Sequence, residues 1–417
     1  MNAIVTDWSA AGAAELADIV ALRRAIHADP EVGLHCTRTT AKLRAALEGL
    51  PLEIHDSPST SGFIAVLRGG GQNGRTVLLR GDMDALPMPE ETGLDYASRV
   101  AGAMHACGHD AHSAMLVGAA RALCARRESL PGTVVFMFQP GEEGWHGARY
   151  MIEDGLLDVA RPDAAFALHI LPTLDAGRVL SRAGPLLAST DALNVTIRGN
   201  GGHAAMPHET IDPIPVACEI VTALQGFVAR RIAVTDPAVL SITKISAGSA
   251  YNIVPGDVMM IGTLRTLSDA TRAFAQAGFT RVAEGIAAAH GCTAEVRIDE
   301  GYPVTRNDPR AIAAIRDIAE GLQQGSWRTM ATPMMGGEDF SYVLREVPGA
   351  MAFLGAAPAG SEALKNPPLH NTKMTIDEDV FARGVALHCA FAQRVLEEGL
   401  PAHEQLPGSA ARTEESQ

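Results

Sequence analysis

The chain has 417 residues, of which 47% are hydrophobic and 20% are charged, an ordinary composition for a globular protein. A chain of this length has room for two or three domains with large buried cores, so it needs neither disulfides nor a structural metal in order to fold. The net charge of −14 argues against nucleic-acid binding, which requires a basic face.

The sequence gives no indication of membrane insertion or secretion. No apolar run reaches the roughly 18 residues of a membrane helix, and residues 1–10 lack the basic and apolar regions of a signal peptide. Six cysteines lie far apart along the chain, a spacing that fits reduced thiols better than a disulfide framework. We therefore expect a cytoplasmic protein that binds neither nucleic acid nor membranes.

The first part of the chain alternates predicted strands with predicted helices. A helical pattern over residues 10–27 ends at Asp29-Pro30, a sequence that stops helices. Short apolar runs then predict strands at 63–67, 76–79, 133–138, 164–168 and 350–354, with helices at 111–126 and 145–153. Strands that are apolar along their whole length suit a sheet covered on both faces. The alternation therefore favours an α/β sandwich.

The middle of the chain has a different pattern, with strands that alternate between polar and apolar residues. Strands are predicted at 191–198, 239–246 and 258–265, and helices at 211–230 and 268–290. The resulting β-α-β-β-α-β order predicts a separate ferredoxin-like α+β domain. We place this domain at 187–300, inserted into a discontinuous domain of 1–186 and 301–400, and we expect the polar segment 401–417 to be a disordered tail.

Polar residues gather at the predicted ends of three strands. The segments are Gly81-Asp82-Met83-Asp84, Gln139-Pro140-Gly141-Glu142-Glu143 and Ala167-Leu168-His169. Ligands of open α/β sheets bind beyond the carboxyl ends of the strands. We therefore expect the three segments to contribute to one site.

Cys107 and His109 lie just before a predicted helix and could complete a metal site. Thiolate, imidazole and carboxylate groups are typical ligands of zinc and similar divalent ions. Each residue taken singly has an ordinary explanation, since a lone cysteine is usually a small core residue and an acidic pair is usually a solvated loop. Their joint occurrence with acidic groups at strand ends favours a metal centre.

The adjacent glutamates need not share one role. If Glu143 binds a metal, Glu142 can take the proton from a metal-bound water, whose pKa a divalent ion lowers to about 7. A buried glutamate can then serve as base and afterwards as acid. The alternative is an exposed acidic pair favoured by the dipole at the start of a helix.

The segment Gly199-Asn200-Gly201-Gly202-His203-Ala204 fits the G-x-G-x-x-A pattern of dinucleotide-binding proteins. Two prolines, Pro207 and Pro213, interrupt the helix that should follow, and no acidic residue ends a partner strand about 20 residues later. The glycines are therefore predicted to form a turn that projects His203. The dinucleotide alternative would require NAD(H) binding, which we do not expect.

Taken together, these motifs resemble the M20 metallopeptidases, in particular the amidohydrolase subgroup of hippurate hydrolases and indole-acetyl-amino-acid hydrolases. The resemblance spans about residues 15–395. Its motifs occur in order as Arg80–Pro87, Ala106–His112, Gln139–Glu143, Ala167–His169, Gly201–His208, Asn252–Pro255, Gly262–Arg265, Gly337–Tyr342 and Leu369-His370. Each motif is weak alone, whereas nine in order are specific.

The resemblance implies a mixed-sheet α/β sandwich of zinc-exopeptidase type with an inserted ferredoxin-like lid, which usually also forms a dimer. It further implies two divalent ions per subunit, held by Cys107, His109, Glu143, His169 and His370. Zinc suits these ligands best, and manganese, cobalt or nickel are alternatives. In the same family, Glu142 would be the general acid and base, and Asp84 would orient a ligand.

Three lid residues also receive roles from the resemblance. His203 would stabilise the oxyanion, often across a dimer, while Asn252 and Arg265 would hold the carboxylate of the substrate, which suits a guanidinium group. Cys107 stands where other branches have a bridging aspartate. This sequence also departs from the subgroup at Gly141, where alanine is usual, and at His35-Cys36, where acidic residues are expected.

The predicted reaction is hydrolysis of an N-acyl amino acid to a carboxylate and a free amino acid. Two divalent ions carry +4, of which Cys107 and Glu143 neutralise about 2 and a hydroxide about 1, so the site should favour an anionic substrate. A dipeptidase or aminopeptidase is the alternative within the family. A non-catalytic metal or amino-acid binder is a further alternative, which the presence of Glu142 and His203 argues against.

Overall fold

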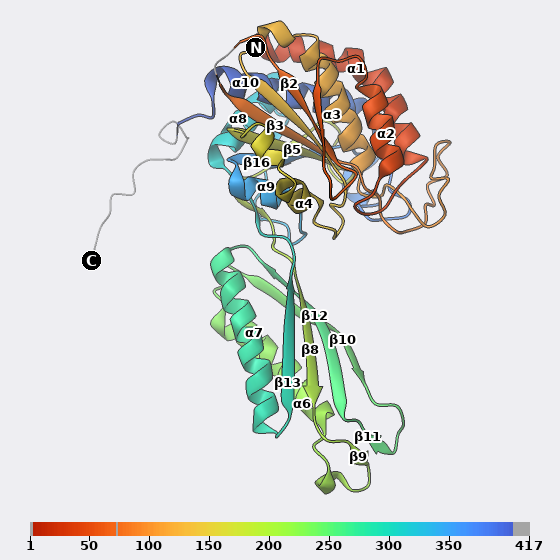
Figure 1. The fold of residues 1–417 in the computed structure, drawn as a ribbon, viewed down its shortest axis with the longest axis vertical. Coiled ribbons are helices and arrows are strands. Elements are labelled where there is room, and N and C mark those ends of the chain that lie inside the picture. The colour runs from red at the N-terminus through yellow and green to blue at the C-terminus, as the bar shows by residue number, and fades with distance from the viewer. Residues whose placement is uncertain (1–2, 72–73, 403–417) are drawn as a thin grey trace, which may run out of the picture. The chain divides into compact units, whose positions relative to one another are not determined.

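The computed structural model describes residues 3–71 and 74–402 and divides them into two compact units (Figure 1). The larger unit contains the described residues up to Leu186, then Arg306–Thr332, and those from Tyr342 onward. The smaller unit contains Leu187–Thr305 and Pro333–Ser341.

The larger unit is built on an eight-stranded mixed sheet. In spatial order the strands are β1 (Glu53–Asp56), β2 (Phe63–Arg68), β4 (Thr133–Gln139), β3 (Thr76–Asp82), β5 (Ala164–Leu171), β16 (Gly349–Gly355), β6 (Val179–Ser181) and β15 (Trp327–Thr329). β4, β3, β5 and β16 run parallel to one another, whereas β2 is antiparallel to β4 and β6 is antiparallel to β16. The expected mixed α/β architecture is confirmed.

The central strands are buried on both faces of this sheet. Every residue of β3 and β16 is buried, as is almost every residue of β4 and β5. Successive side chains of a strand point to opposite faces, so continuous burial requires cover on both sides. β-branched and aromatic residues such as Val134, Val135 and Phe136 fit such a position.

Helices cover the sheet and one another. They are α1 (Ala3–His27), α2 (Thr37–Ala46), α3 (His109–Cys124), α4 (Gly147–Glu153), α5 (Leu156–Val159), α8 (Pro309–Leu322), α9 (Ser341–Glu346) and α10 (Phe381–Glu398). α3 contacts β3, α1 and α10, and nearly all of its residues are buried. Small residues permit this packing, since a Cβ at Gly118 would lie 2.7 Å from a methyl group of Val385 in α10.

Two predicted elements differ from the structure in a way that concerns the site. The strand expected at 164–168 extends to Leu171, so His169 lies within β5 and not beyond its end. The helix expected to begin at Trp145 begins at Gly147, because Gly144 and His146 have left-handed backbone angles that no helix interior allows. The acidic pair Glu142-Glu143 therefore belongs to a turn.

The smaller unit contains a four-stranded antiparallel sheet and two helices. Its elements are β8 (Asp191–Arg198), α6 (Pro213–Arg231), β10 (Ala238–Ala247), β12 (Asp257–Thr266), α7 (Asp269–Ala289) and β13 (Thr293–Glu300). The spatial order β10-β12-β8-β13 with all neighbours antiparallel is the ferredoxin-like arrangement. A second, two-stranded sheet joins β9 (Gly202–His203) to β11 (Ile253–Val254).

The smaller unit has a hydrophobic core of its own. β8 alternates strictly, so that Leu193, Val195 and Ile197 are buried against α6 and α7. Asp212 caps α6 by accepting a hydrogen bond from the backbone N–H of Ile214, and Ser268 caps α7 in the same manner. Local signals and core packing thus agree about where these helices begin.

None of the helices in the described part of the chain is long and apolar enough to cross a membrane. The predicted disordered tail, 401–417, lies outside the described residues from position 403 onward.

Candidate metal centre

The candidate site of the larger unit lies at one edge of its sheet. β4, β3 and β5 are adjacent and parallel, so their carboxyl ends meet at the same edge. β3 ends at Asp82 and β4 ends at Gln139, and the acidic residues of both motifs follow directly. The structure therefore brings these two segments together.

Asp84 holds the segment that follows β4. Its Oδ1 accepts a hydrogen bond from the backbone N–H of Glu142 at 3.0 Å, and its Oδ2 accepts one from the backbone N–H of Glu143 at 3.1 Å. Oδ1 also lies 3.4 Å from Nδ1 of His109. A single buried carboxylate thus fixes the backbone of both glutamates and stands beside His109.

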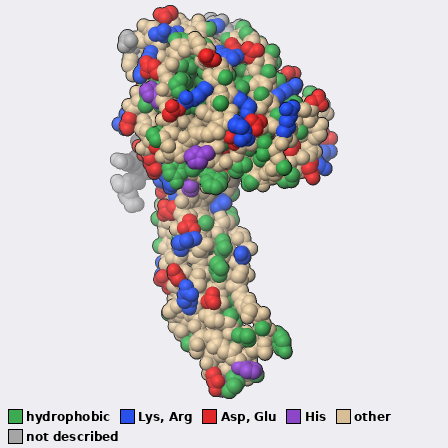
Figure 2. Space-filling model, turned by 45° about the vertical axis from the view of Figure 1, so that its right-hand side comes forward, with side chains coloured by type: hydrophobic (Ala, Val, Ile, Leu, Met, Phe, Trp, Pro, Cys, Tyr) green, Lys and Arg blue, Asp and Glu red, His purple; other side chains and the backbone are tan. Residues whose placement is uncertain are grey.

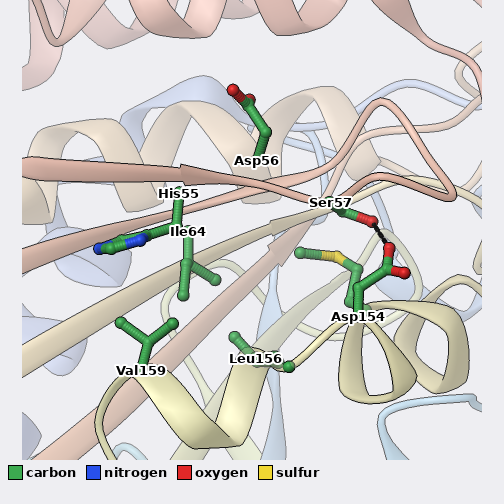
Figure 3. A pocket seen from close by; sticks show the side chains of 9 residues that line it. His55, Asp56, Ser57, Ile64, Asp154, Leu156 and Val159 are labelled. Atoms are coloured by element: carbon green, nitrogen blue, oxygen red, sulfur yellow. Dashed lines mark hydrogen bonds between the residues drawn. The ribbon is translucent and has the colours of Figure 1, made fainter.

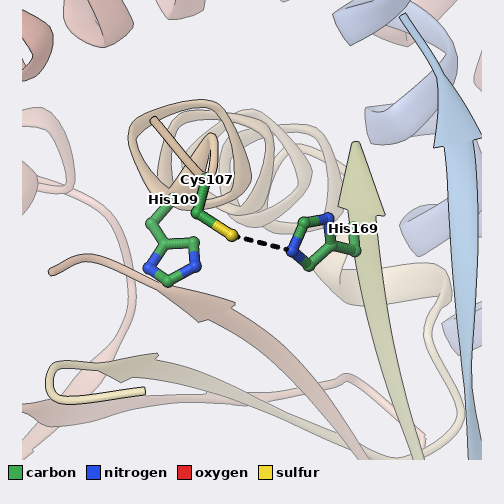
Figure 4. A group of neighbouring side chains, drawn as sticks. All are labelled: Cys107, His109 and His169. Carbon is green, nitrogen blue, oxygen red and sulfur yellow. Dashed lines mark hydrogen bonds between the residues drawn. The ribbon is translucent and has the colours of Figure 1, made fainter. Parts of the chain in front are cut away.

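Cys107 and His109 flank Gly108, whose backbone no other residue could adopt without strain. Gly108 has a φ of 87°, and a Cβ there would lie 2.5 Å from Cδ1 of Ile170. The missing side chain lets the start of α3 pass close to β5. As a result, Sγ of Cys107 lies 3.4 Å from Nε2 of His169 (Figure 4).

His169 presents a lone pair toward Cys107. Its Nδ1 lies 2.7 Å from the carbonyl oxygen of Ile170, which can only accept, so Nδ1 carries the proton and donates it. Nε2 of the neutral ring is then free to act as a ligand. Metal-binding histidines commonly donate their other ring N–H to a carbonyl group in this way.

His370 reaches the same place from a late loop of the chain. Its backbone N–H donates to the carbonyl oxygen of Ala106 at 2.8 Å, and its Nε2 lies 3.1 Å from Oε1 of Glu143. Its φ of 62° is left-handed, which is unusual for a residue with a side chain. Strain of this kind persists where the surroundings fix the residue, as at functional sites.

Two buried polar atoms of the site lack hydrogen-bond partners among the described residues. They are the two ring nitrogens of His109. A buried polar atom without a partner costs about 1–3 kcal/mol, so native structures rarely leave one unexplained. A divalent ion would take one ring nitrogen of His109 as a ligand and leave the other to donate to Oδ1 of Asp84, 3.4 Å from Nδ1, so the residues fit a metal centre.

The candidate ligands form two groups that share one thiol. Ligand atoms of Cys107, His109 and His169 lie within 4.8 Å of one another, and so do those of Cys107, Glu143 and His370. Thiolate, imidazole and carboxylate together form a donor set that zinc and related ions accept. One ion held by each group would use all five residues.

The electrostatics of the second group also favour a cation. Hydrogen bonds with Cys107 and Glu143 raise the pKa of His370 to about 10. Burial alone would raise the pKa of Glu143, but the hydrogen bond from His370 and the charge of His109 lower it below its usual value. In the absence of metal, protonated histidines would balance the negative groups that divalent ions can balance instead.

His112 supports the site, although the sequence assigned it no role. Its Nε2 accepts the backbone N–H of Ile170 at 2.8 Å, and its Nδ1 donates to Oδ1 of Asp82 at 2.6 Å. Burial would raise the pKa of Asp82, but Arg80, His109 and His112 hold it well below its usual range. His109 and His112 are three residues apart on α3, a spacing that places them on one helix face.

A second buried network stands behind the start of α3. Oδ2 of Asp110 lies 2.7 Å from Nε of Arg23 and 2.7 Å from Nδ1 of His27, both on α1. The other ring nitrogen of His27 lies 3.2 Å from Oε1 of Glu90. Burial would raise the pKa of Glu90, but its hydrogen bonds with His27, Thr92 and Ser98 lower it to about 2. The network therefore contains ionised carboxylates with fixed partners.

A cavity of about 160 Å³ lies elsewhere in the larger unit, between β1, β2, α4 and α5 (Figure 3). Asp154 in its wall accepts hydrogen bonds from the hydroxyl of Ser57 at 2.5 Å and from the backbone N–H of Ser59 at 2.9 Å. Its lining includes none of the candidate metal ligands or the two glutamates of the site. We assign no role in the reaction to this cavity.

Two of the three candidate residues of the smaller unit, His203 and Asn252, are exposed, whereas Arg265 is half-buried. His203 belongs to β9 and pairs with Ile253 of β11, and its Nδ1 accepts only the backbone N–H of Ala205 at 3.1 Å among the contacts described. Asn252 is also exposed, and Tyr251 is 99% exposed. Figure 2 shows hydrophobic and histidine side chains together on the surface at this end of the unit. Such a patch is suited to contact with another surface.

Arg265 lies at the opposite end of the smaller sheet from His203. The β9–β11 pair adjoins the start of β12, because the backbone N–H of Gly199 donates to Gly256 at 2.9 Å. Arg265 follows Asp257 by eight residues along β12, which corresponds to ~26 Å of extended strand. The structure therefore does not bring Arg265 together with His203 and Asn252 within one smaller unit.

The glycine segment around residue 200 does not lead into a helix. It is followed by β9 and a short 3₁₀ turn at Pro207–Glu209, and α6 begins only at Pro213. A dinucleotide fingerprint needs its glycines to open directly into a helix whose N-terminus meets the phosphates. The glycines instead allow close approach, since a Cβ at Gly201 would lie 2.6 Å from the carbonyl oxygen of Val254.

Comparisons with known proteins agree about the relationship of this chain. The sequence profile described as Peptidase family M20/M25/M40 matches residues 78–394. Thermostable carboxypeptidase 2 of Saccharolobus solfataricus is 36% identical over 377 residues, or 90% of this chain and 94% of that protein. N-acetylcysteine deacetylase of Bacillus subtilis is 38% identical over 380 residues, or 91% of this chain and 97% of that protein.

A solved structure supports the same relationship. The crystal structure of the Bacillus subtilis YXEP protein, described as a dinuclear metal-binding peptidase from the M20 family, matches with a TM-score of 0.80 and 35% identity. The match covers 92% of this chain and 99% of that one.

Proposed function

The chain belongs to peptidase family M20/M25/M40, and we propose that this member hydrolyses the amide bond of N-acyl amino acids to give a carboxylate and a free amino acid. It is a metal-dependent amidohydrolase with a centre for two divalent ions. The observation that carries the proposal is the position of Glu142. Its Oε2 lies 3.9 Å from Nε2 of His109. Glu142 is therefore close to the candidate ligands without being one of the five.

We assign the ligands from the two groups that the structure brings together. Cys107, His109 and His169 would hold one ion, and Cys107, Glu143 and His370 would hold the other. When bound, the ions would polarise the acyl oxygen and lower the pKa of a water molecule to about 7. Zinc suits this donor set best, and manganese, cobalt and nickel are the alternatives.

Glu142 would serve as the general base and then as the general acid. Its backbone is fixed through Asp84, so its carboxylate stays beside the centre without being needed as a ligand. It is nearly buried, at 7% exposure, and a carboxylate removed from water is suited to exchanging protons near neutral pH. It would take a proton from the attacking water and deliver it to the leaving amine.

The variant Glu142→Gln tests this role, since it keeps the size of the side chain and removes the proton acceptor. We expect full metal content and a loss of about 10²–10⁴-fold in kcat on N-acetyl amino acids. Glu128→Gln, an exposed glutamate of the same unit, is the matched control and should keep wild-type activity. Substantial turnover by metal-loaded Glu142→Gln would exclude the assignment.

The smaller unit would act as the lid. His203 would donate to the oxyanion, and Asn252 and Arg265 would hold the substrate carboxylate. An N-acyl amino acid is much shorter than the ~26 Å that separates the two ends of β12. We therefore propose a homodimer. One substrate would contact Arg265 from one subunit and His203 from the other, so that His203 acts across the dimer.

A dipeptidase or aminopeptidase acting on short peptides is the alternative, which the carboxypeptidase among the relatives fits less well than the N-acetylcysteine deacetylase fits the proposed function. A free dipeptide differs from an N-acyl amino acid by a cationic amino group. Hydrolysis of N-acetyl and N-benzoyl amino acids but not of free dipeptides would support the proposed function, and the reverse result would support the alternative.

We also place the protein in the cytoplasm. All six cysteines are free, and a reducing compartment would keep the Cys107 thiol available as a ligand.

A further inference from the structure

The turn that carries the acidic pair also carries an exposed tryptophan. Trp145 is 50% exposed, whereas Trp8 and Trp327 are 1% and 9% exposed. Trp145 follows Glu143 by two residues, so their Cα atoms lie within about 7 Å of each other. A half-exposed indole therefore belongs to the same turn as the proposed general base.

Two glycines make room for this indole. A Cβ at Gly33 would lie 3.3 Å from Cε2 of Trp145, so the ring packs against the backbone of that glycine. A Cβ at Gly141 would lie 3.2 Å from Cβ of Trp145 and 2.6 Å from Cδ2 of Leu34. Both glycines have left-handed φ values, of 84° and 73°. The resemblance led us to expect alanine at position 141. The glycine found there avoids a clash with the side chains of Trp145 and Leu34.

The residue after Trp145 is fixed from the other side. His146 has a φ of 59° and is, with His370, one of two residues other than glycine with a left-handed φ in the described chain. Its Nδ1 lies 3.0 Å from the hydroxyl of Tyr342 in α9. A strained conformation that is held by a side-chain contact keeps the backbone of the turn in one arrangement. Trp145 is therefore presented by a rigid support.

We propose that Trp145 forms one wall of the acyl-binding part of the site and selects N-acyl amino acids whose acyl group is aromatic. This inference rests on the proposed function. The proposed function assigns the substrate carboxylate to residues of the smaller unit and the amide to Glu142, and it leaves the acyl group without an assigned contact. A flat acyl group can stack on the exposed part of the indole, whereas an acetyl group covers little of it.

The decisive comparison uses N-benzoylglycine and N-acetylglycine, which share the amide, the amino acid and the carboxylate. In metal-loaded protein, we expect Trp145→Ala to lower kcat/KM for N-benzoylglycine by about 10- to 100-fold, mainly through KM, and to change that for N-acetylglycine by less than about 3-fold. Trp145→Phe keeps an aromatic face and should retain most of the preference. Equal changes on both substrates would overturn the inference.

A binding measurement separates this inference from the proposed function. Calorimetric titration of metal-loaded Glu142→Gln protein with the same two compounds needs no turnover. Adding Trp145→Ala should weaken binding of N-benzoylglycine by at least about 10-fold and leave that of N-acetylglycine unchanged. Wild-type protein that hydrolyses neither compound contradicts the proposed function, whereas unchanged N-benzoylglycine affinity in the double variant contradicts the role of Trp145.

The support for the tryptophan can be tested by a smaller change. Tyr342→Phe removes only the hydroxyl that contacts His146. We expect a loss of benzoyl preference in the same direction as for Trp145→Ala but smaller, about 2- to 5-fold, because the variant loses one hydrogen bond of the turn and keeps the indole. A gain in benzoyl preference would show that the rigid turn does not serve aromatic binding.

Discussion

In the larger unit most candidate residues are buried, with His370 as the exposed exception, whereas in the smaller unit His203 and Asn252 are exposed and held only locally. His109 illustrates the first case, since both of its ring nitrogens are buried without hydrogen-bond partners in the described chain. His203 illustrates the second, since water can satisfy its free nitrogen. A buried histidine without hydrogen-bond partners requires a ligand. An exposed histidine is hydrated until a substrate or another subunit contacts it.

The difference in burial between the two units corresponds to two roles in the proposed reaction, metal binding and substrate binding. The larger unit would set the affinity for the ions, and the smaller unit would act on the substrate only during turnover. Variants in the two regions should therefore change different measurements.

His203→Ala should have the largest effect of the variants that test this comparison. We expect a loss of about 10²–10³-fold in kcat, the usual cost of removing one donor to an oxyanion. Metal content and the thermal midpoint should stay at wild-type values, because His203 is exposed and distant from any core. His208→Ala, an exposed histidine of the same unit, is the matched control. Loss of metal in His203→Ala would break the comparison.

Mixing two inactive proteins tests whether His203 acts across a dimer. In an equal mixture of Glu142→Gln and His203→Ala subunits that can exchange, half of the dimers would carry one fully native site, so roughly a quarter of wild-type activity should return. Activity that stays at the level of the separate variants would show that both residues serve the same subunit.

Asp84→Asn should have an intermediate effect that is confined to the metal centre. The amide keeps one acceptor but replaces the other with a donor, so it cannot accept both backbone hydrogen bonds. We expect metal affinity to fall by about 10- to 100-fold, which competition with a chelator would measure. Asp158→Asn, at an exposed position of α5, should leave the affinity unchanged.

Glu90→Gln should have the smallest effect and should change stability alone. The pKa of Glu90 is lowered from 4.5 to about 2, so its ionised form stabilises the folded state. This contribution is fully present above pH 4.5 and is lost as the pH falls toward 2. We expect a destabilisation of about 1–2 kcal/mol at pH 7, measured by urea unfolding.

The pH dependence of that loss is the sharper measurement. The difference between wild type and Glu90→Gln should shrink between pH 4.5 and pH 2. Glu53→Gln removes an exposed surface pair with Arg68 and should cost less than about 0.5 kcal/mol at any pH. A loss in Glu90→Gln that grows as the pH falls would contradict the assignment.

Local sequence signals predicted much of the fold. Strict alternation predicted the strand at 191–198 with its observed ends, and apolar runs predicted β2, β3, β4 and β16 to within a few residues. The mixed α/β architecture, the family and the two-metal amidohydrolase are confirmed. The predicted strand at 164–168 was too short, because the hydrophobic run continues past His169 to Leu171.

Contacts between distant segments could not be predicted. Asp110 meets His27, and His146 meets Tyr342, across 83 and 196 residues, and no local pattern specifies such pairs. The role of His112 had a signal, since it shares a helix face with His109, but its two partners depend on the sheet. The individual ligand assignments, the metal, the dimer and the roles of His203, Asn252 and Arg265 stay predictions.

The order of the ligands along the chain has a consequence for biosynthesis. Four of the five proposed ligands precede the smaller unit, and His370 follows it, 201 residues after His169. At a translation rate of about 5–20 residues per second, the centre would wait roughly 10–40 s for its last ligand to leave the ribosome. During that interval the smaller unit can fold around its own hydrophobic core. Cys107 then belongs to a metal centre that still lacks one ligand and that free ions in the cell can reach.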